Sequence, residues 1–233
     1  MYNFDDDLKR WREYANKIHS RFQEERWDFY ILSQGLIEPR AHKLIAGFSR
    51  SKKRILELGV GGGEHFHFEK GSGDRDLYVG VDIILDCVRI AKKENIPHVI
   101  NANGVYLPFC NQRFDCCIAF GVLEHVGDLE GMFREINRVL DEEGEFLVVV
   151  PTNGSLVVDF FKKMITYPSL YIRGIRRPSW IWHYENVNHF KRINCLISKS
   201  FVVKESRGIP FRLIPWHFSP LWFFRCLKRN NER

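Results

Sequence analysis

The chain has 233 residues, of which 45% are hydrophobic and 27% are charged, a composition typical of a globular protein with one sizeable core. No apolar run approaches the roughly 18 residues that a membrane-spanning helix needs, so the sequence predicts no membrane-spanning helix. The net charge of +6 is divided unevenly, because residues 1–159 carry 20 Lys and Arg against 26 Asp and Glu, whereas residues 160–233 carry 15 against 3. The basic C-terminal part predicts an anionic partner, such as nucleic acid, anionic lipid or a phosphorylated substrate.

The N-terminal part is predicted to be mainly helical over residues 5–48, because its apolar residues recur at helical spacing. Pro39 fits the first turn of a second helix that reaches Phe48. We therefore expect residues 1–50 to form a helical extension or lid, and residues 51–233 to form the main domain.

From Lys53 onward the sequence alternates between strand and helix patterns. Strands are predicted near 54–58, 77–81, 98–101, 114–119 and 144–150, and helices near 63–69, 84–94 and 129–140. This alternation predicts an α/β fold with a Rossmann-like, doubly wound, mostly parallel sheet. Beyond Pro151 the pattern is looser: helices are expected at 155–165 and 190–198 and a strand at 201–205, with 211–214 as a further strand candidate.

The acidic start of the chain, residues 1–7, lacks the basic flank and apolar stretch of a signal peptide, so we expect a cytoplasmic protein. None of the six cysteines forms a Cys-x-x-Cys pair. Buried free thiols in a reducing compartment are the expected state.

Residues 54–64 carry the strongest functional signal. A short apolar run ends in a glycine-dense turn with Gly59, Gly61, Gly62 and Gly63, which lets the backbone approach a ligand. A dinucleotide fingerprint would need a third glycine at position 64, where Glu64 stands, and a phosphate-binding Gly-Lys-Ser/Thr is absent. The pattern therefore favours a cofactor without phosphates.

The sequence Glu-Leu-Gly-Val-Gly-Gly-Gly at 57–63 resembles the first motif of class I S-adenosylmethionine-dependent methyltransferases. Segments 78–82, 103–109 and 114–151 follow in that family's order and spacing, and the resemblance is closest to the broad group of ubiquinone-biosynthesis methyltransferases. It implies S-adenosyl-L-methionine as cofactor and a sheet of about seven strands that ends in an antiparallel pair.

The resemblance also implies which residues bind the cofactor. Asp82 would accept the ribose hydroxyls, with capping of the following helix as its alternative role. Asn103 stands where the family usually has Asp, but its carbonyl can still accept from the adenine amino group. The full set of expected cofactor-binding residues is Glu57, Gly59, Gly61, Gly63, Asp82, Ile83, Asn103, Gly104 and Phe120.

Three histidines are candidates for a proton acceptor or substrate contact: His125 first, then His183 and His189. For each, a capping or packing role is the alternative. The segment before His125 lacks the first Glu of a Glu-x-x-Glu-His metal motif, so no metal site is assigned.

The sequence thus predicts an enzyme that methylates oxygen on a small-molecule, saccharide or lipid-linked acceptor. The alternatives are an RNA methyltransferase, a non-catalytic cofactor-binding partner subunit and a nicotinamide-dependent oxidoreductase. The C-terminal segment 214–229 is aromatic and basic. It is expected either to pack Trp216, Trp222 and Phe223 on the sheet, or to contact an anionic membrane peripherally.

Overall fold

The computed structural model describes residues 37–69, 74–152 and 188–229, with 156, 160, 163–164 and 167–172 between the last two ranges. The expected helices before residue 37, His183, and most of the expected helix at 155–165 therefore lie outside the described residues. Within the described ranges, no helix is both long enough and apolar enough to cross a bilayer.

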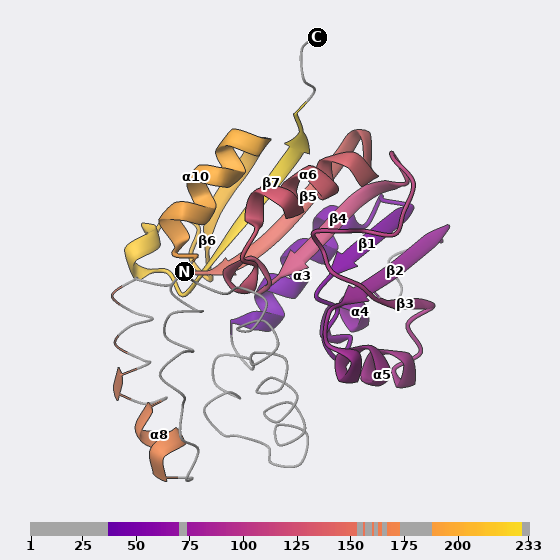
Figure 1. Cartoon of the computed structure of the whole chain (residues 1–233). Helices are drawn as coiled ribbons and strands as arrows, with labels where there is room; N and C mark the ends of the chain where they lie inside the picture. The colour runs from indigo at the N-terminus through magenta and orange to yellow at the C-terminus, as the bar shows by residue number, and fades with distance from the viewer. Residues whose placement is uncertain are drawn as a thin grey trace, which may run out of the picture.

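The described residues form one seven-stranded sheet with the order β3-β2-β1-β4-β5-β7-β6 (Figure 1). Strands β1 to β5 are parallel, and β7 runs antiparallel to both β5 and β6. This confirms the predicted Rossmann-like, mostly parallel sheet and its final antiparallel pair. The strands are β1 (Arg54–Leu58), β2 (Leu77–Asp82), β3 (His98–Asn101), β4 (Phe114–Phe120), β5 (Leu140–Pro151), β6 (Phe201–Ile209) and β7 (Leu221–Lys228).

Helices cover both faces of this sheet, because apolar side chains alternate between the two faces of each buried strand. Ile55 of β1 packs in a core with Ala41 and Ile45 of α3, whereas Leu56 packs in a second core with helices α6 and α10. The helices are α3 (Glu38–Ser49), α4 (Glu64–Glu69), α5 (Leu85–Lys93), α6 (Leu129–Val139), α8 (Tyr167–Ile172) and α10 (Phe190–Ser200), with short 3₁₀ turns η1 (Leu123–His125) and η3 (Trp216–Phe218).

Helix α3 begins where Pro39 predicted, since proline is favoured in a first helical turn, where an N–H would have no intrahelical partner. Strand β5 begins four residues earlier than expected, because Leu140 already pairs with Phe114 across a register shift in β4. Of the six cysteines, four are buried as expected, but Cys110 and Cys195 are exposed.

The expectation of a strand at 211–214 was wrong. Pro210 and Pro215 flank this segment, and proline cannot donate to a sheet ladder. Phe211 and Leu213 are instead exposed in the connection after β6. The second antiparallel strand is β7, which lies between β5 and β6.

The C-terminal segment packs on the domain, which was one of its two expected states. Phe223 is fully buried, and the rings of Trp216 and Trp222 contact the ring of Phe190 at centroid distances of 5.1 and 5.6 Å. Arg225 of this segment pairs within the fold, because it donates two hydrogen bonds to Glu145 at 2.9 and 2.7 Å.

The position of β7 predicts a large stability effect for Phe224→Ala. Phe224 is fully buried and pairs with Val148 on one side and Ser206 on the other. Loss of this ring should lower the free energy of unfolding by about 3–5 kcal/mol in urea denaturation. Val202→Ala on the exposed part of β6 is the control and should cost less than about 1 kcal/mol. Equal effects of the two substitutions would contradict a buried central β7.

Candidate active site

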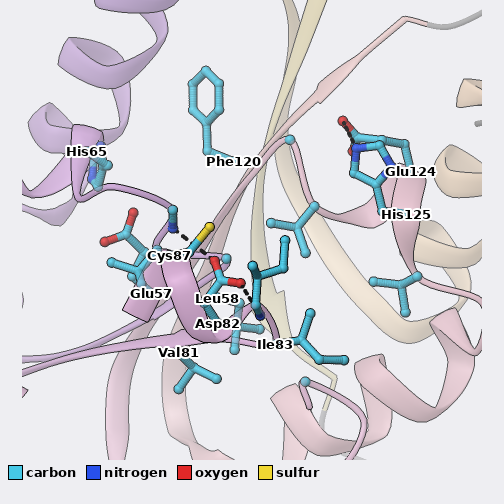
Figure 2. A pocket seen from close by; sticks show the side chains of 18 of the residues that line it. Glu57, Leu58, His65, Val81, Asp82, Ile83, Cys87, Phe120, Glu124 and His125 are labelled. Carbon is cyan, nitrogen blue, oxygen red and sulfur yellow. Dashed lines mark hydrogen bonds and ion pairs between the residues drawn. The ribbon is translucent and has the colours of Figure 1, made fainter. Parts of the chain in front are cut away.

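A cavity of about 460 Å³ lies beyond the carboxyl ends of β1, β2 and β4, where ligands bind in open parallel sheets (Figure 2). Figure 2 shows Asp82 near its centre, with His65 to one side and Glu124 and His125 to the other. Of the expected site residues, the structure places these around the cavity: Glu57, Gly59, Gly61, Asp82, Ile83, Asn103, Gly104, Phe120 and His125.

The glycine-dense turn holds the backbone close to its neighbours. Gly59 has a φ of +69°, and a Cβ there would lie 2.2 Å from Cγ2 of Val122, so only glycine fits. Gly63 also has a positive φ, but a Cβ there would meet Ile96 instead. Gly63 is not among the residues that line the cavity, and its Cβ position points toward the loop after α5 instead.

Asp82, the last residue of β2, links two parts of the site. Its Oδ2 accepts from the amide of Gly61 at 3.0 Å, and its Oδ1 accepts from the amide of Ile84 at 2.8 Å. Helix α5 begins at Leu85 with Ile84 as its N-cap residue, so Asp82 does not occupy the capping position. A carboxylate has about four acceptor sites, so these bonds are compatible with hydrogen bonds to a ligand diol.

Glu57 is buried at the base of the cavity, where the hydroxyl of Tyr78 donates to its Oε2 at 2.5 Å. The pKa of Glu57 is raised to about 8, mainly by burial and also by the neighbouring carboxylates of Glu64, Glu69 and Asp82, against the opposing effect of the Tyr78 hydrogen bond. The carboxyl group is therefore poised to ionise when a positive charge arrives beside it.

The side chain of Asn103 stabilises the turn in which it lies, because its Oδ1 accepts a hydrogen bond from the amide of Val105 at 3.1 Å. The site of the expected adenine contact is thus a pre-formed turn beside Gly104, where a Cβ would lie 3.0 Å from Cε of Met132. Ile83 and Phe120 add apolar walls to the cavity.

His125 lies in η1 with its side chain 29% exposed, and its Nε2 is 3.9 Å from Oε1 of Glu124. Asn188 fixes this turn, because its Nδ2 donates to the carbonyls of Leu123, at 3.0 Å, and of Val126. His189 follows Asn188 but is exposed at the start of α10 and is not among the cavity-lining residues. His183 lies outside the described residues.

The sequence reasoning missed the contribution of α3 and α4 to the cavity, which consists of Glu38, His42, Glu64 and His65. Burial, together with the nearby carboxylate of Glu64, raises the pKa of Glu38 to about 7. The spacing of Glu38 and His42, four residues apart, places them on one helical face. Only the packing of α3 against α4 shows that this face meets the site.

The cavity is strongly acidic. Among its described lining residues there are five carboxylic acids and no Lys or Arg: Glu38, Glu57, Glu64, Asp82 and Glu124. No group of three or more His, Cys, Asp or Glu side chains in the described part of the chain is arranged to hold a metal ion. Such a cavity disfavours phosphate groups and favours a ligand that carries positive charge.

Residues 56–148 match a family model described as a methyltransferase domain. An uncharacterized protein of Methanocaldococcus jannaschii is 38% identical over 97 residues, which cover 41% of this chain and 36% of that protein. Demethylmenaquinone methyltransferase of Corynebacterium kroppenstedtii is 28% identical over 120 residues, covering 48% and 51% of the two chains. The chain thus spans about half or less of the length of these two relatives.

The fold is also similar to solved structures. A crystal structure of a SAM-dependent methyltransferase from Thermotoga maritima superimposes with a TM-score of 0.62 at 16% identity, covering 91% of this chain and 99% of that one. At this level of identity, the similarity shows the shared fold, including the seven-stranded sheet.

The raised pKa of Glu57 predicts a pH-dependent effect of Glu57→Gln. Since the folded protein holds the proton to a higher pH than the unfolded chain does, wild-type stability falls as pH rises from about 4.5 to about 8. The amide cannot ionise, so the stability of the variant relative to wild type should rise with pH by at most about 1.4 kcal/mol per unit across this window. Urea denaturation at pH 5, 6, 7 and 8 without ligand measures this difference.

The exposed Glu130→Gln is the matched control, and its difference from wild type should stay nearly constant with pH. A Glu57→Gln difference that is equally constant would contradict a protonated Glu57 at neutral pH.

Proposed function

We propose that this chain is a class I S-adenosylmethionine-dependent methyltransferase, which binds S-adenosyl-L-methionine and transfers the methyl group to an acceptor; the match of residues 56–148 to a methyltransferase-domain model supports this. The acidic cavity is the observation that carries this proposal. The cofactor has a positive sulfonium and a positive ammonium group and no phosphate, and five carboxylic acids without a described Lys or Arg match that charge. The same charge opposes the diphosphate of a nicotinamide dinucleotide.

In the proposed complex, the backbone at Gly59 and Gly61 lies along the methionine and ribose portions of the cofactor. Asp82 accepts hydrogen bonds from the ribose hydroxyls. Glu57 lies below the glycine turn and acts through water on the ammonium group. Its pKa of about 8 implies that the arriving cation favours the ionised form, so binding near neutral pH releases a proton.

The adenine ring is proposed to lie between Ile83 and the turn at Asn103 and Gly104, since all three line the cavity beyond Asp82. Phe120, at the end of β4, is on the wall from which the methyl group is approached. These assignments use the cavity-lining residues that the sequence predicted, apart from Gly63.

For the acceptor, we propose a small-molecule, saccharide or lipid-linked compound that is methylated on oxygen. A hydroxyl must lose its proton during transfer, so this reaction needs a positioned proton acceptor and exclusion of water. Histidines at the cavity suit that need, and His125 is proposed to contact the acceptor from η1. The exposed side chains of Phe211, Leu213 and Phe218 are the described apolar groups with which a peripheral membrane contact would be made.

The function is tested by titrating S-adenosylmethionine into the protein in a calorimeter and then offering methyl-labelled cofactor to a cell extract. We expect saturable binding and one labelled low-molecular-weight or lipid product. Binding without any labelled product would favour a non-catalytic partner subunit. Labelled RNA, together with RNA binding that weakens steeply with salt, would favour the nucleic-acid alternative. Stabilisation by NAD but not by S-adenosylhomocysteine would overturn the cofactor assignment.

Asp82→Ala is expected to weaken S-adenosylhomocysteine binding by at least about 100-fold, because two hydrogen bonds to a charged acceptor are lost and the Gly61 amide loses its partner. Isothermal titration measures the affinity. Asp82→Asn keeps the shape and one acceptor oxygen and should show an intermediate loss. Unchanged affinity in Asp82→Ala would contradict the proposed ribose site.

A further inference from the structure

A chain of three buried polar side chains joins α4 to the cavity through α3. Nδ1 of His42 lies 3.1 Å from Nδ1 of His65, and Nε2 of His65 lies 3.0 Å from Oε1 of Glu69. All three residues are at least nine-tenths buried, and both histidines line the cavity. The contact of His42 with His65 uses Nδ1, so the ring nitrogen that remains for a ligand is Nε2.

The far end of this chain is firmly anchored. Glu69 also accepts from Arg75 and from the hydroxyl of Ser49, which fixes its carboxylate beneath the helices. Arg75 in turn donates to the carbonyls of Ser49 and Lys52 at 3.1 and 2.9 Å. The position of Glu69 is therefore fixed by Arg75, Ser49 and His65, without a contribution from His42. The contact of His42 with His65 is not needed to hold this carboxylate.

The near end is oriented by aromatic packing. The ring of His42 stacks on Phe120 with a centroid distance of 4.2 Å and on Phe68 at 4.9 Å. Phe120 ends β4 and lines the cavity, so it holds the imidazole beside the place where the methyl group is expected. A ring fixed on its face by two aromatic rings and at Nδ1 by His65 presents Nε2 in one direction.

The charge states suit a proton acceptor. Burial and the neighbouring His65 lower the pKa of His42 to about 3, so its ring is uncharged at neutral pH. Burial alone would raise the pKa of Glu69, but His65, Ser49 and Arg75 together keep it below its usual value, so Glu69 is ionised. Other titratable groups of the same cavity are Glu38, one turn before His42 on α3, Glu64 on α4, and Glu57 on β1, whose carboxyl group is electrostatically coupled to Glu69.

Resting on the proposed methyl transfer, we propose that His42 is the catalytic base that accepts the proton of the acceptor hydroxyl, while His65 and Glu69 position and polarise it. This requires His42 to carry its proton on Nδ1 and donate to His65, and His65 to carry its proton on Nε2 and donate to Glu69. Nε2 of His42 then offers a lone pair to the cavity.

The step balances as follows. An oxygen lone pair attacks the sulfonium methyl carbon, the carbon–sulfur bond breaks and its electron pair stays on sulfur as a neutral thioether. The hydroxyl proton moves to Nε2 of His42, and the electron pair of the O–H bond remains on the ether oxygen. The Nδ1 proton of His42 moves to Nδ1 of His65, so the positive charge ends beside ionised Glu69.

This transfer explains how a desolvated imidazole with a low pKa serves as a base. Alone, His42 would have to hold a positive charge at a position shielded from water, at a high desolvation cost. Because the charge passes to His65, it is stabilised by the carboxylate and its hydrogen-bond network. His125 lies on the side of the cavity opposite His65, 3.9 Å from Oε1 of Glu124, and keeps its proposed role as an acceptor contact (Figure 2).

The first test needs no turnover. With ¹⁵N-labelled histidine and saturating S-adenosylhomocysteine, imidazole NMR at pH 7 should show His42 protonated on Nδ1 only and His65 protonated on Nε2 only. His42 protonated on Nε2 would overturn the proposal, because that nitrogen could not accept. The wild-type protein is used, so this result does not depend on the folding of any variant.

The second test measures labelled methyl transfer into a cell extract by wild type, His42→Gln and His67→Gln. His67 is an exposed histidine on the same helix as His65, paired with Glu94 outside the cavity, and its substitution should change neither rate nor affinity. His42→Gln should lower the rate by about 10²–10⁴-fold, with S-adenosylhomocysteine affinity within about twofold of wild type.

The pH profile separates a base from a structural residue. At saturating cofactor, wild-type turnover should vary much less from pH 6 to 8 than that of His42→Gln, because His42 stays uncharged there, even though the cavity carboxyl groups of Glu38 and Glu57 ionise in this window. The residual rate of His42→Gln should rise about tenfold per pH unit as the acceptor hydroxyl ionises by itself. Glu69→Gln should reduce the rate less than His42→Gln, and His125→Ala should slow turnover without this steep pH dependence.

The outcomes distinguish the two proposals. Wild type that fails to bind S-adenosylhomocysteine, or that labels nothing, refutes the proposed function and the relay together. Normal wild-type binding and turnover with an unimpaired His42→Gln refutes the relay alone. A His42→Gln variant that loses cofactor affinity in parallel with its rate, or whose rate keeps the wild-type pH profile, likewise removes His42 as the base.

Discussion

The site depends on the carboxylate of Asp82. It accepts from Gly61 on the turn after β1 and from Ile84 just before α5, so one side chain fixes two neighbouring loops relative to each other. The two loops come from adjacent parallel strands, whose register brings Leu58 opposite Val81. A backbone turn rich in glycine has many accessible conformations, and a charged acceptor at its centre selects one of them. It adds to the backbone bonds from Gly59 and Val60 to the carbonyl of Val81, which hold the same turn against β2.

Basic and acidic side chains occupy different parts of this molecule. The C-terminal part is basic, yet several of its described cations are paired within the fold: Arg225 with Glu145, and Lys228 and Arg229 with backbone carbonyls. Five carboxylic acids, by contrast, line the cavity without a described Lys or Arg among them. Net charge therefore says little about the ligand, whereas the local arrangement favours a cationic cofactor and opposes phosphates. This local field, more than the glycine turn alone, separates the proposed cofactor from a dinucleotide.

The same arrangement has a cost in stability. Glu57 and Glu69 are buried carboxylic acids, and burial disfavours their ionised forms. The two carboxyl groups differ in their partners: Glu69 is stabilised as an anion by Arg75, Ser49 and His65. Among the described residues, Glu57 has the Tyr78 hydroxyl as its one side-chain donor and retains its proton to a higher pH. A protein selected for stability alone would have no reason to keep Glu57 here, which accords with a role in binding a positive charge.

The parallel sheet, the succession of strands and helices along the chain, and the strand ends that line the cavity were predictable from local signals. These are side-chain periods of 2 and 3.6 residues, the glycine turn and the acid at the end of a strand. The position of β7 was not predictable. Segment 211–214 remained a strand candidate until the tertiary structure showed that 221–228 pairs with both β5 and β6. Gly63 was expected at the cavity, but a Cβ at this position would point toward Ile96, because the orientation of the turn backbone depends on the helix that follows. The four-residue spacing of His65 and Glu69 can be seen in the sequence. The contact of His65 with His42, 23 positions away, depends on the packing of α3 against α4, which no local pattern encodes.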